Sequence, residues 1–300
     1  MPTFIGDIFS LNDVYEQQTT EVDVAVVEVN PIGITTVTEI TVQSNIWSNS
    51  NTHGWFGGGN IPGGVNVSTV DRIDFSNDSS TASVRGPLSA AKGYLSATGN
   101  SNYGWFGGGR TLAVTLSTVD RINFSNDSST ASTRGPLSAA RYRLSATGNS
   151  NYGWFGGGIP GPVSTVDRID FSNDSSRASV RGPLSLARSS LAATGNSNYG
   201  WFGGGLTPGP AVVSTVDRIN FSNDSFTAST RGPLSLARLS STATGNSNYG
   251  WFGGGGLPGG VAVSTVDRIN FSNDSSGASV RGPLSAARYS LGATSNTPVG

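Results

Sequence analysis

The chain has 300 residues, of which 12% are charged, with a formal net charge of −1 at pH 7 and no cysteine. No basic run occurs, so both the electrostatic footprint of a nucleic-acid-binding protein and the polybasic patch of a membrane-surface protein are missing. The lack of cysteine excludes disulfides and thiolate metal ligands. The first residues lack the basic flank of a signal peptide, and no stretch is long and apolar enough to span a bilayer. We therefore expect a soluble protein without membrane insertion.

The first 45 residues differ from the rest of the chain. Residues 22–29 and 34–42 predict two strands joined across 30–33. The opening 20 residues carry too much apolar surface for a free tail. Their apolar side chains are Phe4, Ile5, Ile8, Phe9, Leu11, Val14 and Tyr15. We interpret residues 1–45 as a small β arm that docks the protein onto a larger assembly. The alternative is that this arm packs on the rest of its own chain.

From residue 46 onward the chain repeats. The pentad Trp-Phe-Gly-Gly-Gly begins at positions 55, 105, 154, 201 and 251, at spacings of 50, 49, 47 and 50 residues. A period of this length is typical of stacked or radially arranged supersecondary units. Residues present in five copies are expected to hold the repeats together rather than to perform one reaction.

Each repeat predicts four short strands, as the second copy illustrates. Residues 95–99, 103–106, 117–124 and 132–134 are separated by turns rich in Gly, Asn, Asp and Pro. No segment has the apolar spacing of an amphipathic helix. Four short strands per unit of about 50 residues are typical of a propeller blade. The sequence therefore predicts an all-β fold, with a five-bladed β-propeller over residues 46–300.

The repeat resembles the kelch repeat over residues 53–294. A Gly-Gly pair ends the second strand, Ser-Thr-Val-Asp-Arg-Ile opens the third, and Gly-Pro-Leu-Ser-x-Ala-Arg leads into the next first strand. The resemblance implies a kelch-like propeller. The chain departs from the kelch pattern at one point, because the usual Trp of the fourth strand is missing and a Trp precedes the glycines instead.

The two ends of the repeat region predict how the ring closes. The first repeat has residues 45–49 where the others have a first strand, and residues 287–294 form an extra first strand after the last repeat. We predict that this C-terminal strand completes the first blade, which would also remove exposed sheet edges. The alternative is an open solenoid, which would need polar caps at both ends.

All length variation between the repeats lies in one loop, between the glycines and Ser-Thr-Val. Loops 60–67, 110–116, 159–163 and 206–213 have 8, 7, 5 and 8 residues, and subtracting them leaves 42 residues in every period. With loop 256–263 they should emerge on one face of a propeller, where they either drift freely or form a recognition surface. The candidate interaction residues are Asn60, Ile61, Arg110, Thr111, Leu112, Ile159, Leu206, Thr207 and Leu257.

Two further sets of positions vary between the repeats. One set is the residue pair after the cation that leads into each blade, at 93–94, 142–143, 189–190, 239–240 and 289–290. The other set is the entry to the fourth strand, where Phe226 stands in place of the Ser of the other four copies. An exposed Phe226 would mark a contact.

The other repeated residues are interpreted as structural. The Trp-Phe pairs are expected to pack between blades; the alternative is a platform for stacking sugars. The repeated Asp and Arg side chains are expected to form blade-to-blade ion pairs or to bond to the backbone, because a buried charge persists only when paired. These positions are Trp55, Trp105, Trp154, Trp201, Trp251, Asp71, Asp120, Asp167, Asp217, Asp267, Arg85, Arg134, Arg181, Arg231 and Arg281.

The sequence contains no unique set of residues suited to catalysis or to metal binding. The Gly triplets are not followed by the Lys-Ser/Thr of a phosphate-binding loop. His53, the only histidine, takes the place of a repeated Tyr and has no Cys or second His to complete a zinc site. A turn explains the Asn77-Asp-Ser segment and its copies better than a calcium loop does. We predict no catalytic residue, no metal, no cofactor and no enzymatic activity.

A narrower resemblance joins the repeats to the start of the chain. Near-identical Tyr-Gly-Trp-Phe-Gly-Gly-Gly and Ser-Thr-Val-Asp-Arg-Ile segments, following the Ile-Phe-Ser-Leu-Asn-Asp-Val-Tyr start at 8–15, resemble kelch-like virion proteins of phages that infect marine cyanobacteria. The resemblance implies a tail, fibre or capsid-surface component of the virion, assembled in the host cytoplasm. Its expected partners are other virion proteins, bound through residues 1–45 in an oligomeric assembly, and a host receptor or glycan, but not nucleic acid.

Two alternatives to a virion structural protein stay open. A lectin-like carbohydrate-binding propeller would need exposed aromatic rings on the loop face, and the five loops contain no Trp, Tyr or Phe. An enzyme of the kelch-containing oxidase or lyase type would need a cluster of His or Cys side chains, which the sequence lacks.

Overall fold

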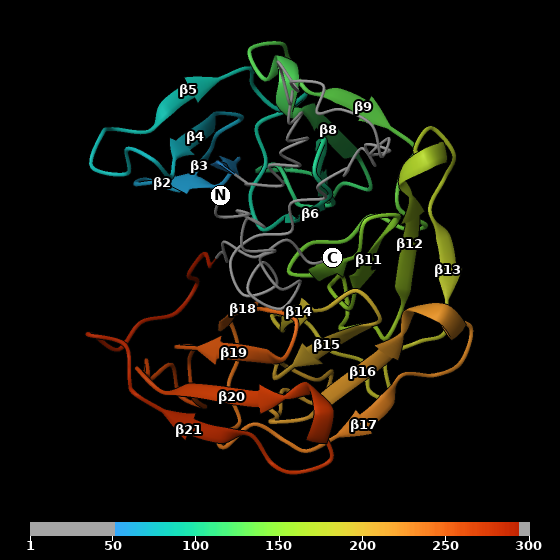
Figure 1. Ribbon diagram of the computed structural model, residues 1–300, viewed down its shortest axis with the longest axis vertical. Coiled ribbons are helices and arrows are strands. Elements are labelled where there is room, and N and C mark those ends of the chain that lie inside the picture. Colours follow the sequence, from blue (N-terminus) through green and yellow to red (C-terminus); the bar gives the residue numbers. More distant parts are fainter. Residues whose placement is uncertain (1–51, 294–300) are drawn as a thin grey trace, which may run out of the picture. The chain divides into compact units, whose positions relative to one another are not determined.

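A computed structural model of the protein describes residues 52–293. These residues form an all-β, five-bladed β-propeller, as the repeat predicts. In Figure 1 the blades follow one another around a central axis in chain order. The predicted arm at 1–45, with its candidate docking residues, and Thr294 lie outside the described residues.

Blades 2 to 5 each contain four antiparallel strands in sequence order. In blades 2 and 3 these are β6 (Ser96–Gly99), β7 (Tyr103–Gly107), β8 (Val119–Asn123), β9 (Ser132–Arg134), β10 (Ser145–Gly148), β11 (Tyr152–Gly156), β12 (Val166–Asp170) and β13 (Ser179–Arg181). In blades 4 and 5 they are β14 (Ala192–Gly195), β15 (Tyr199–Gly203), β16 (Val216–Asn220), β17 (Ser229–Arg231), β18 (Thr242–Gly245), β19 (Tyr249–Gly253), β20 (Val266–Asn270) and β21 (Ser279–Arg281).

Blade 1 has three strands, β1 (His53–Gly57), β4 (Val70–Asp74) and β5 (Ser83–Arg85). Its long loop forms a separate hairpin of β2 (Asn60–Ile61) and β3 (Val65–Asn66). The place of a first strand beside β1 is unfilled in the described part of the chain.

The second and third strands of each blade share one register. In blade 2, Tyr103 pairs with Asn123, Trp105 with Arg121 and Gly107 with Val119. Aromatic and β-branched residues favour such strands. The second strand ends where Gly108 adopts φ +68°, a conformation at which a side chain would strike the carbonyl oxygen of Arg141. The glycines thus turn the chain out of the strand in a space that only glycine fits.

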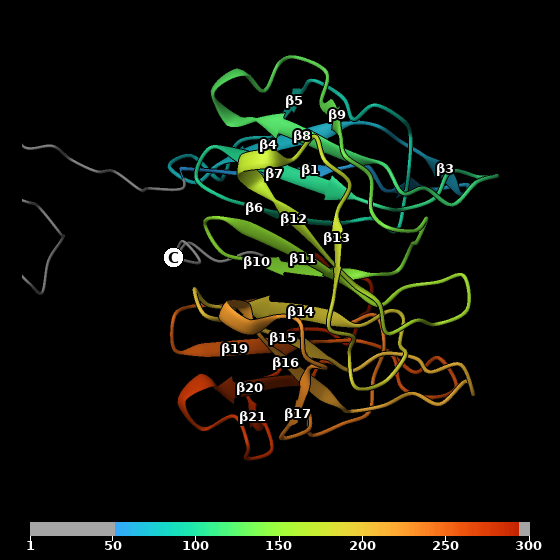
Figure 2. The same ribbon diagram turned by 90° about the vertical axis from the view of Figure 1, so that its right-hand side faces the viewer.

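The third strand ends in a single 3₁₀ turn where the sequence predicts a turn. In blade 2 this turn covers Phe124–Asn126, and the Asn123 side chain accepts a hydrogen bond from the Ser125 N–H at 3.1 Å. Equivalent turns follow β12, β16 and β20. The variable loop precedes the third strand and this turn follows it, so the two lie at opposite ends of the strand. In Figure 2 the loops extend together to one side.

The apolar core lies between neighbouring blades. Between blades 2 and 3, Trp105 and Val119 pack with Phe155 and Ile169, and all four are buried. Residues equivalent to these form the clusters between blades 1 and 2, 3 and 4, and 4 and 5. Because each cluster draws on two blades, burial of these side chains stabilises the contact between neighbouring blades.

The predicted closure by the C-terminal strand is not formed in this structure. Residues 287–293 contain no strand, and β1 pairs with β4 alone. Gly292 nevertheless lies close to the Phe56 ring. Residue 294 is outside the description, and closure by this strand stays a prediction.

Candidate functional site

A carboxylate hub joins each of blades 2 to 5 to the blade before it. Asp174, in the turn after β12, accepts a hydrogen bond from the Trp105 indole N–H at 2.8 Å. It also forms an ion pair with Arg121 at 2.9 Å. The Nε atom of Arg134 lies 3.6 Å from the same oxygen. The Asp174 side chain is 7% exposed, so its charge is held away from most of the solvent. One carboxylate therefore ties three side chains of blade 2 to blade 3.

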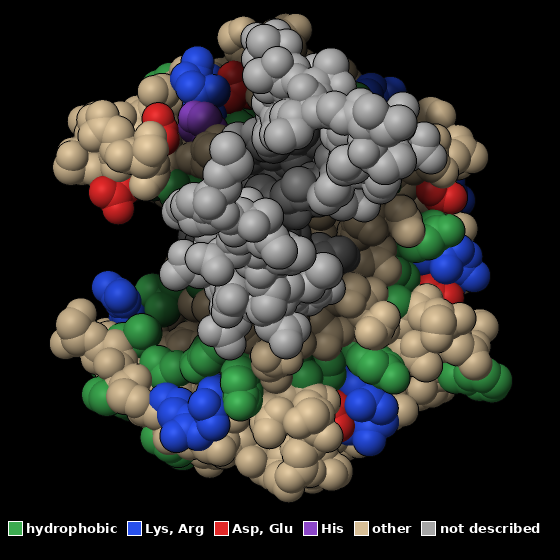
Figure 3. Space-filling model, in the orientation of Figure 1, with side chains coloured by type: hydrophobic (Ala, Val, Ile, Leu, Met, Phe, Trp, Pro, Cys, Tyr) green, Lys and Arg blue, Asp and Glu red, His purple; other side chains and the backbone are tan. Residues whose placement is uncertain are grey.

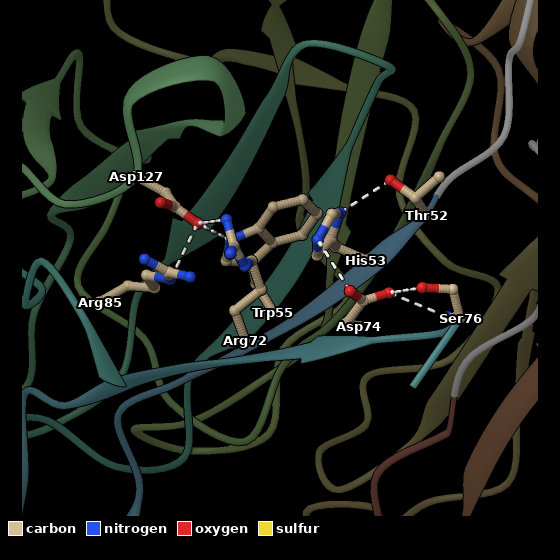
Figure 4. Close-up of polar contacts among 8 residues, drawn as sticks. All are labelled: Thr52, His53, Trp55, Arg72, Asp74, Ser76, Arg85 and Asp127. Atoms are coloured by element: carbon tan, nitrogen blue, oxygen red, sulfur yellow. Dashed lines mark hydrogen bonds and ion pairs between the residues drawn. The ribbon is translucent and has the colours of Figure 1, made fainter. Parts of the chain in front are cut away.

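The hub occurs at four blade junctions. Figure 4 shows Asp127 with Trp55, Arg72 and Arg85 of blade 1. Asp224 and Asp274 bind the equivalent side chains of blades 3 and 4. In Figure 3 basic side chains lie beside acidic ones at the upper left, the right and the lower right of the rim.

A second ion pair lies inside each of blades 2 to 5, between the lead-in cation and the Asp of the third strand. Lys92 Nζ lies 3.1 Å from Asp120, and Arg141, Arg188 and Arg238 pair with the equivalent carboxylates. Asp120 and Lys92 are both completely buried. Burial lowers the pKa of Lys92, and the Asp120 carboxylate opposes that shift. Burial likewise lowers the pKa of the three arginines, against the attraction of their carboxylates.

The repeated aromatic side chains extend these contacts. The Trp105 ring stacks on Phe171 of the next blade at 3.8 Å between centroids, and Trp55, Trp154 and Trp201 stack in the same way. On the outer side the Arg121 guanidinium lies 4.3 Å from the Tyr103 ring. His53 takes the equivalent position in blade 1, where its Nε2 lies 4.0 Å from Asp74.

The contacts of the fifth junction are not formed, although the chain supplies the residues for them. Phe56 is 47% exposed, whereas its counterparts Phe106, Phe155, Phe202 and Phe252 are buried. The space over Gly253, which the next blade's Phe fills at the other junctions, contains no Phe. Asp71 and Asp78 of blade 1, and Arg281 and Arg288 of blade 5, form no ion pair within residues 52–293.

Two of the three sets of variable positions, the loops and the residue pairs after the lead-in cations, lie side by side in the structure. Gly93 is bridged to Arg110, the first residue of the loop in its own blade, and Tyr142 to Ile159, Ser189 to Leu206 and Leu239 to Gly256 in the same way. The following residues have positive φ, from 52° to 58°, at Tyr94, Arg143, Ser190, Ser240 and Ser290. Each of the last four donates its N–H to the carbonyl of the one before it, at 2.7–2.9 Å.

This arrangement brings together a cluster that the sequence does not show. Tyr94, Arg110, Tyr142 and Arg143 come from two blades. The Arg110 guanidinium lies 5.0 Å from the Tyr142 ring, and that of Arg143 lies 5.3 Å from the Tyr94 ring. The two tyrosine rings are 6.1 Å apart. We call these four residues the Tyr-Arg cluster.

The candidate loop residues differ in exposure. Asn60, Ile61 and Leu112 are exposed, and Leu112 is joined by the exposed side chains of Val65, Val114 and Val261. The remaining candidates are half-buried at the bases of their loops, namely Arg110, Thr111, Ile159, Leu206, Thr207 and Leu257. Phe226 lies away from these loops, at the entry to the fourth strand, and is 71% exposed.

Residues 52–293 contain no group of three or more His, Asp or Glu side chains placed to hold a metal ion. Within the same residues no helix is long and apolar enough to cross a membrane. The chain matches no protein-family model and no curated protein. The fold is that of a five-bladed β-propeller, whereas the kelch assignment and the likeness to phage proteins rest on the sequence motifs alone.

Proposed function

We propose that this protein is a non-enzymatic structural component of a phage virion, in the tail, a fibre or the capsid surface. Residues 1–45 dock it to other virion proteins, and the propeller is displayed outward for host adhesion. The observation that carries the proposal is a division of labour. The repeated Trp, Asp and Arg side chains are engaged in contacts that build the frame, whereas all length differences between the repeats, and two of their three sets of variable positions, lie on the loop face.

This division is what a display module requires. A frame with the same hub at successive junctions holds its shape while one face changes. Loops on a rigid scaffold are the usual carriers of recognition. The phage assignment adds the resemblance of the repeats and of the 8–15 segment to virion proteins.

The test compares the full-length chain with residues 46–300 and with a full-length variant in which Phe4, Ile8 and Phe9 are changed to Ser. We expect the full-length protein to assemble or to bind phage particles, and both altered proteins to remain monomeric propellers. Circular dichroism and thermal unfolding verify that the propeller is intact. Assembly of the altered proteins to the same extent as the full chain would refute the docking role of the arm.

A lectin-like propeller is a second candidate, and one observation now favours it. The lack of aromatic residues in the loops argues against it at the level of sequence. The structure brings Tyr94, which is 46% exposed, and Tyr142 alongside the loop residue Arg110. Aromatic side chains are therefore available on that face after all.

A further inference from the structure

We propose that the Tyr-Arg cluster binds a carboxylate-bearing saccharide. The inference rests on the proposed function, since it names the chemical class of ligand for the displayed loop face.

The two arginines of the cluster differ from the cations of the frame. In the described residues, every arginine of the four formed hubs and every cation that leads into blades 2 to 5 has a carboxylate partner. Within residues 52–293, Arg110 and Arg143 have no carboxylate within 4.0 Å. The Asp residues of the described part occupy the third strands and the turns that follow them, and the five loops contain no Asp or Glu. Arg110 donates to the Tyr142 hydroxyl and to the Thr111 carbonyl at 3.4 Å, so the positive charge of the cluster has no acidic partner among the described residues.

The backbone does not require large side chains at these positions. Tyr94 and Arg143 have φ of 57° and 55°, which costs conformational free energy in residues with a side chain. Three other copies of the segment have Ser at the equivalent position, Ser190, Ser240 and Ser290, with the same backbone hydrogen bonds. Both Tyr94 and Arg143 are exposed, so burial of their side chains does not offset this cost. A ligand that contacts them gives these side chains a use that the frame does not.

Three kinds of chemistry converge at the cluster. Guanidinium groups bind carboxylates through paired, charge-assisted hydrogen bonds. The tyrosine rings present apolar faces and hydroxyl groups. The Asn66 amide of blade 1 donates to the Arg110 carbonyl at 2.8 Å, and the Asn60 side chain lies against Gly93, so two amides border the site.

A sugar that carries a carboxylate uses all three. Its charge pairs with arginine, its C–H face packs on a tyrosine ring, and its hydroxyls bond to the phenols and amides. A neutral sugar would leave the arginines unpaired. An acidic peptide would use the arginines but offers no ring of C–H groups and hydroxyls to match the tyrosines and amides.

The cluster occurs once in the described propeller, and the other repeats supply matched variants. Position 110 is Asn, Ile, Leu or Gly in the other copies, at 60, 159, 206 and 256. Arg143→Ser and Arg110→Leu therefore install residues that the same frame already accommodates. Arg177→Thr is the control, because Arg177 is exposed outside the cluster, donates to the Ser138 carbonyl, and is Thr in three other copies.

The experiment measures binding to the full-length protein by isothermal titration calorimetry. The probes are a tetragalacturonate, its fully methyl-esterified form and a tetraglutamate peptide. We expect the tetragalacturonate to bind, and each cluster variant and the ester to weaken binding about tenfold or more, as the loss of a charge-assisted hydrogen bond implies. Arg177→Thr should bind as the unaltered protein does, and thermal unfolding verifies that all variants are folded.

The proposal is overturned if no saccharide binds, if the ester binds as tightly as the acid, or if the cluster variants bind unchanged. Tighter binding of the tetraglutamate would overturn it in favour of an acidic protein partner. Particle binding by the same variants keeps the two proposals apart. Loss of saccharide binding with particle binding intact locates the change at the cluster, whereas a protein that does not bind particles at all refutes the virion role instead.

Discussion

Replacing Asp78 by alanine tests whether blade 5 meets blade 1 in solution. Asp78 occupies the position in blade 1 that Asp127, Asp174, Asp224 and Asp274 occupy in the next four blades. The matching donors at the end of the array are Trp251, Arg268 and Arg281. We expect a closed ring in which Asp78 accepts from these three side chains, and in which Phe56 covers Gly253.

The magnitude follows from the junctions that are formed. The indole of Trp105 donates to Asp174 at 2.8 Å, a hydrogen bond to a charged group that is worth about 1.5–3 kcal/mol. The two arginine side chains at this carboxylate are 21% and 24% exposed, so solvent screening limits each of them to about 1 kcal/mol or less. Together these contacts predict that Asp174→Ala lowers the free energy of unfolding by about 3 kcal/mol. In a closed ring, Asp78→Ala should cost a similar amount.

The assay is urea unfolding of the full-length chain, followed by tryptophan fluorescence and circular dichroism. Asp174→Ala is the positive control, because it removes the same side chain from the same local turn. Asp74→Asn is the neutral control on blade 1, because Asp74 caps its own turn through Ser76 and Asn fills that role in three other blades. A double-mutant cycle of Asp78 with Arg268 should give a coupling energy that matches the cycle of Asp174 with Arg121.

An open array makes a different prediction. Asp78 would then be an exposed residue without partners, and its replacement should change the free energy of unfolding by less than about 0.5 kcal/mol. That result, with a full effect of Asp174→Ala, would refute intramolecular closure. The two end surfaces could instead meet between copies of the chain. In that case sedimentation should show an association that depends on protein concentration and that Asp78→Ala weakens.

Three further changes test the frame. Lys92→Arg should stabilise the protein by about 1–2 kcal/mol, because Arg141 bonds two carbonyls at 2.6 and 2.9 Å where Lys92 reaches its carbonyls only at 3.4 and 3.5 Å. Since the pKa of Lys92 is lowered in the folded state, the unfolded chain binds more protons at alkaline pH. The unaltered protein therefore gains stability as pH rises toward the ordinary lysine pKa, and the advantage of the variant should shrink over that rise in chemical denaturation. Trp154→Phe should cost about 1–3 kcal/mol by the same measurement, because it removes the indole N–H that donates to Asp224; no loss would show that this hydrogen bond adds nothing to stability. Phe226→Ser should shift the unfolding free energy by less than about 0.5 kcal/mol, since the ring is exposed, and a larger loss would reveal packing against another surface.

The strands could be predicted from the sequence because residues close to each strand end determine where the strand begins and stops. Aromatic pairs followed by glycines define the second strand, and an Asn or Asp cap ends the third. Such signals depend on neighbouring residues and on backbone geometry, so the order and the number of strands follow from one repeat.

The partners of the repeated charges could not be predicted, because they depend on how blades stack. Asp120 pairs with Lys92 and the adjacent Arg121 pairs with Asp174, so neighbours in sequence have partners in different places. The hub carboxylate was interpreted as a turn residue. One signal could have revealed this role. The hub position is Asp in all five copies, whereas the position that caps the turn is Asp in two copies and Asn in three. A turn accepts either residue, but an ion pair with arginine requires the charge.

The Tyr-Arg cluster escaped prediction for a related reason. Its members lie in two segments that each vary between copies, and neither segment alone has a pattern. The bridge between Gly93 and Arg110 and the hydrogen bond from Arg143 N–H to the Tyr94 carbonyl bring them together, and both contacts belong to the three-dimensional frame. Comparing repeats position by position shows where the chain varies, but only the fold shows that two variable positions are neighbours.

The bases of the variable loops explain how the frame tolerates this variation. In the seven-residue loop the Leu116 N–H donates to the Gly109 carbonyl at 2.9 Å, and in the five-residue loop the Val163 N–H donates to Gly158 at 3.0 Å. The three eight-residue loops close with the same bond, at 2.9–3.0 Å. The loop residues between the two partners of that bond can change in number and kind without moving the third strand. That strand carries the buried Asp and the hub arginine. The loop face is thereby insulated from the contacts that stabilise the ring, as a surface that recognises different ligands on one frame would need to be.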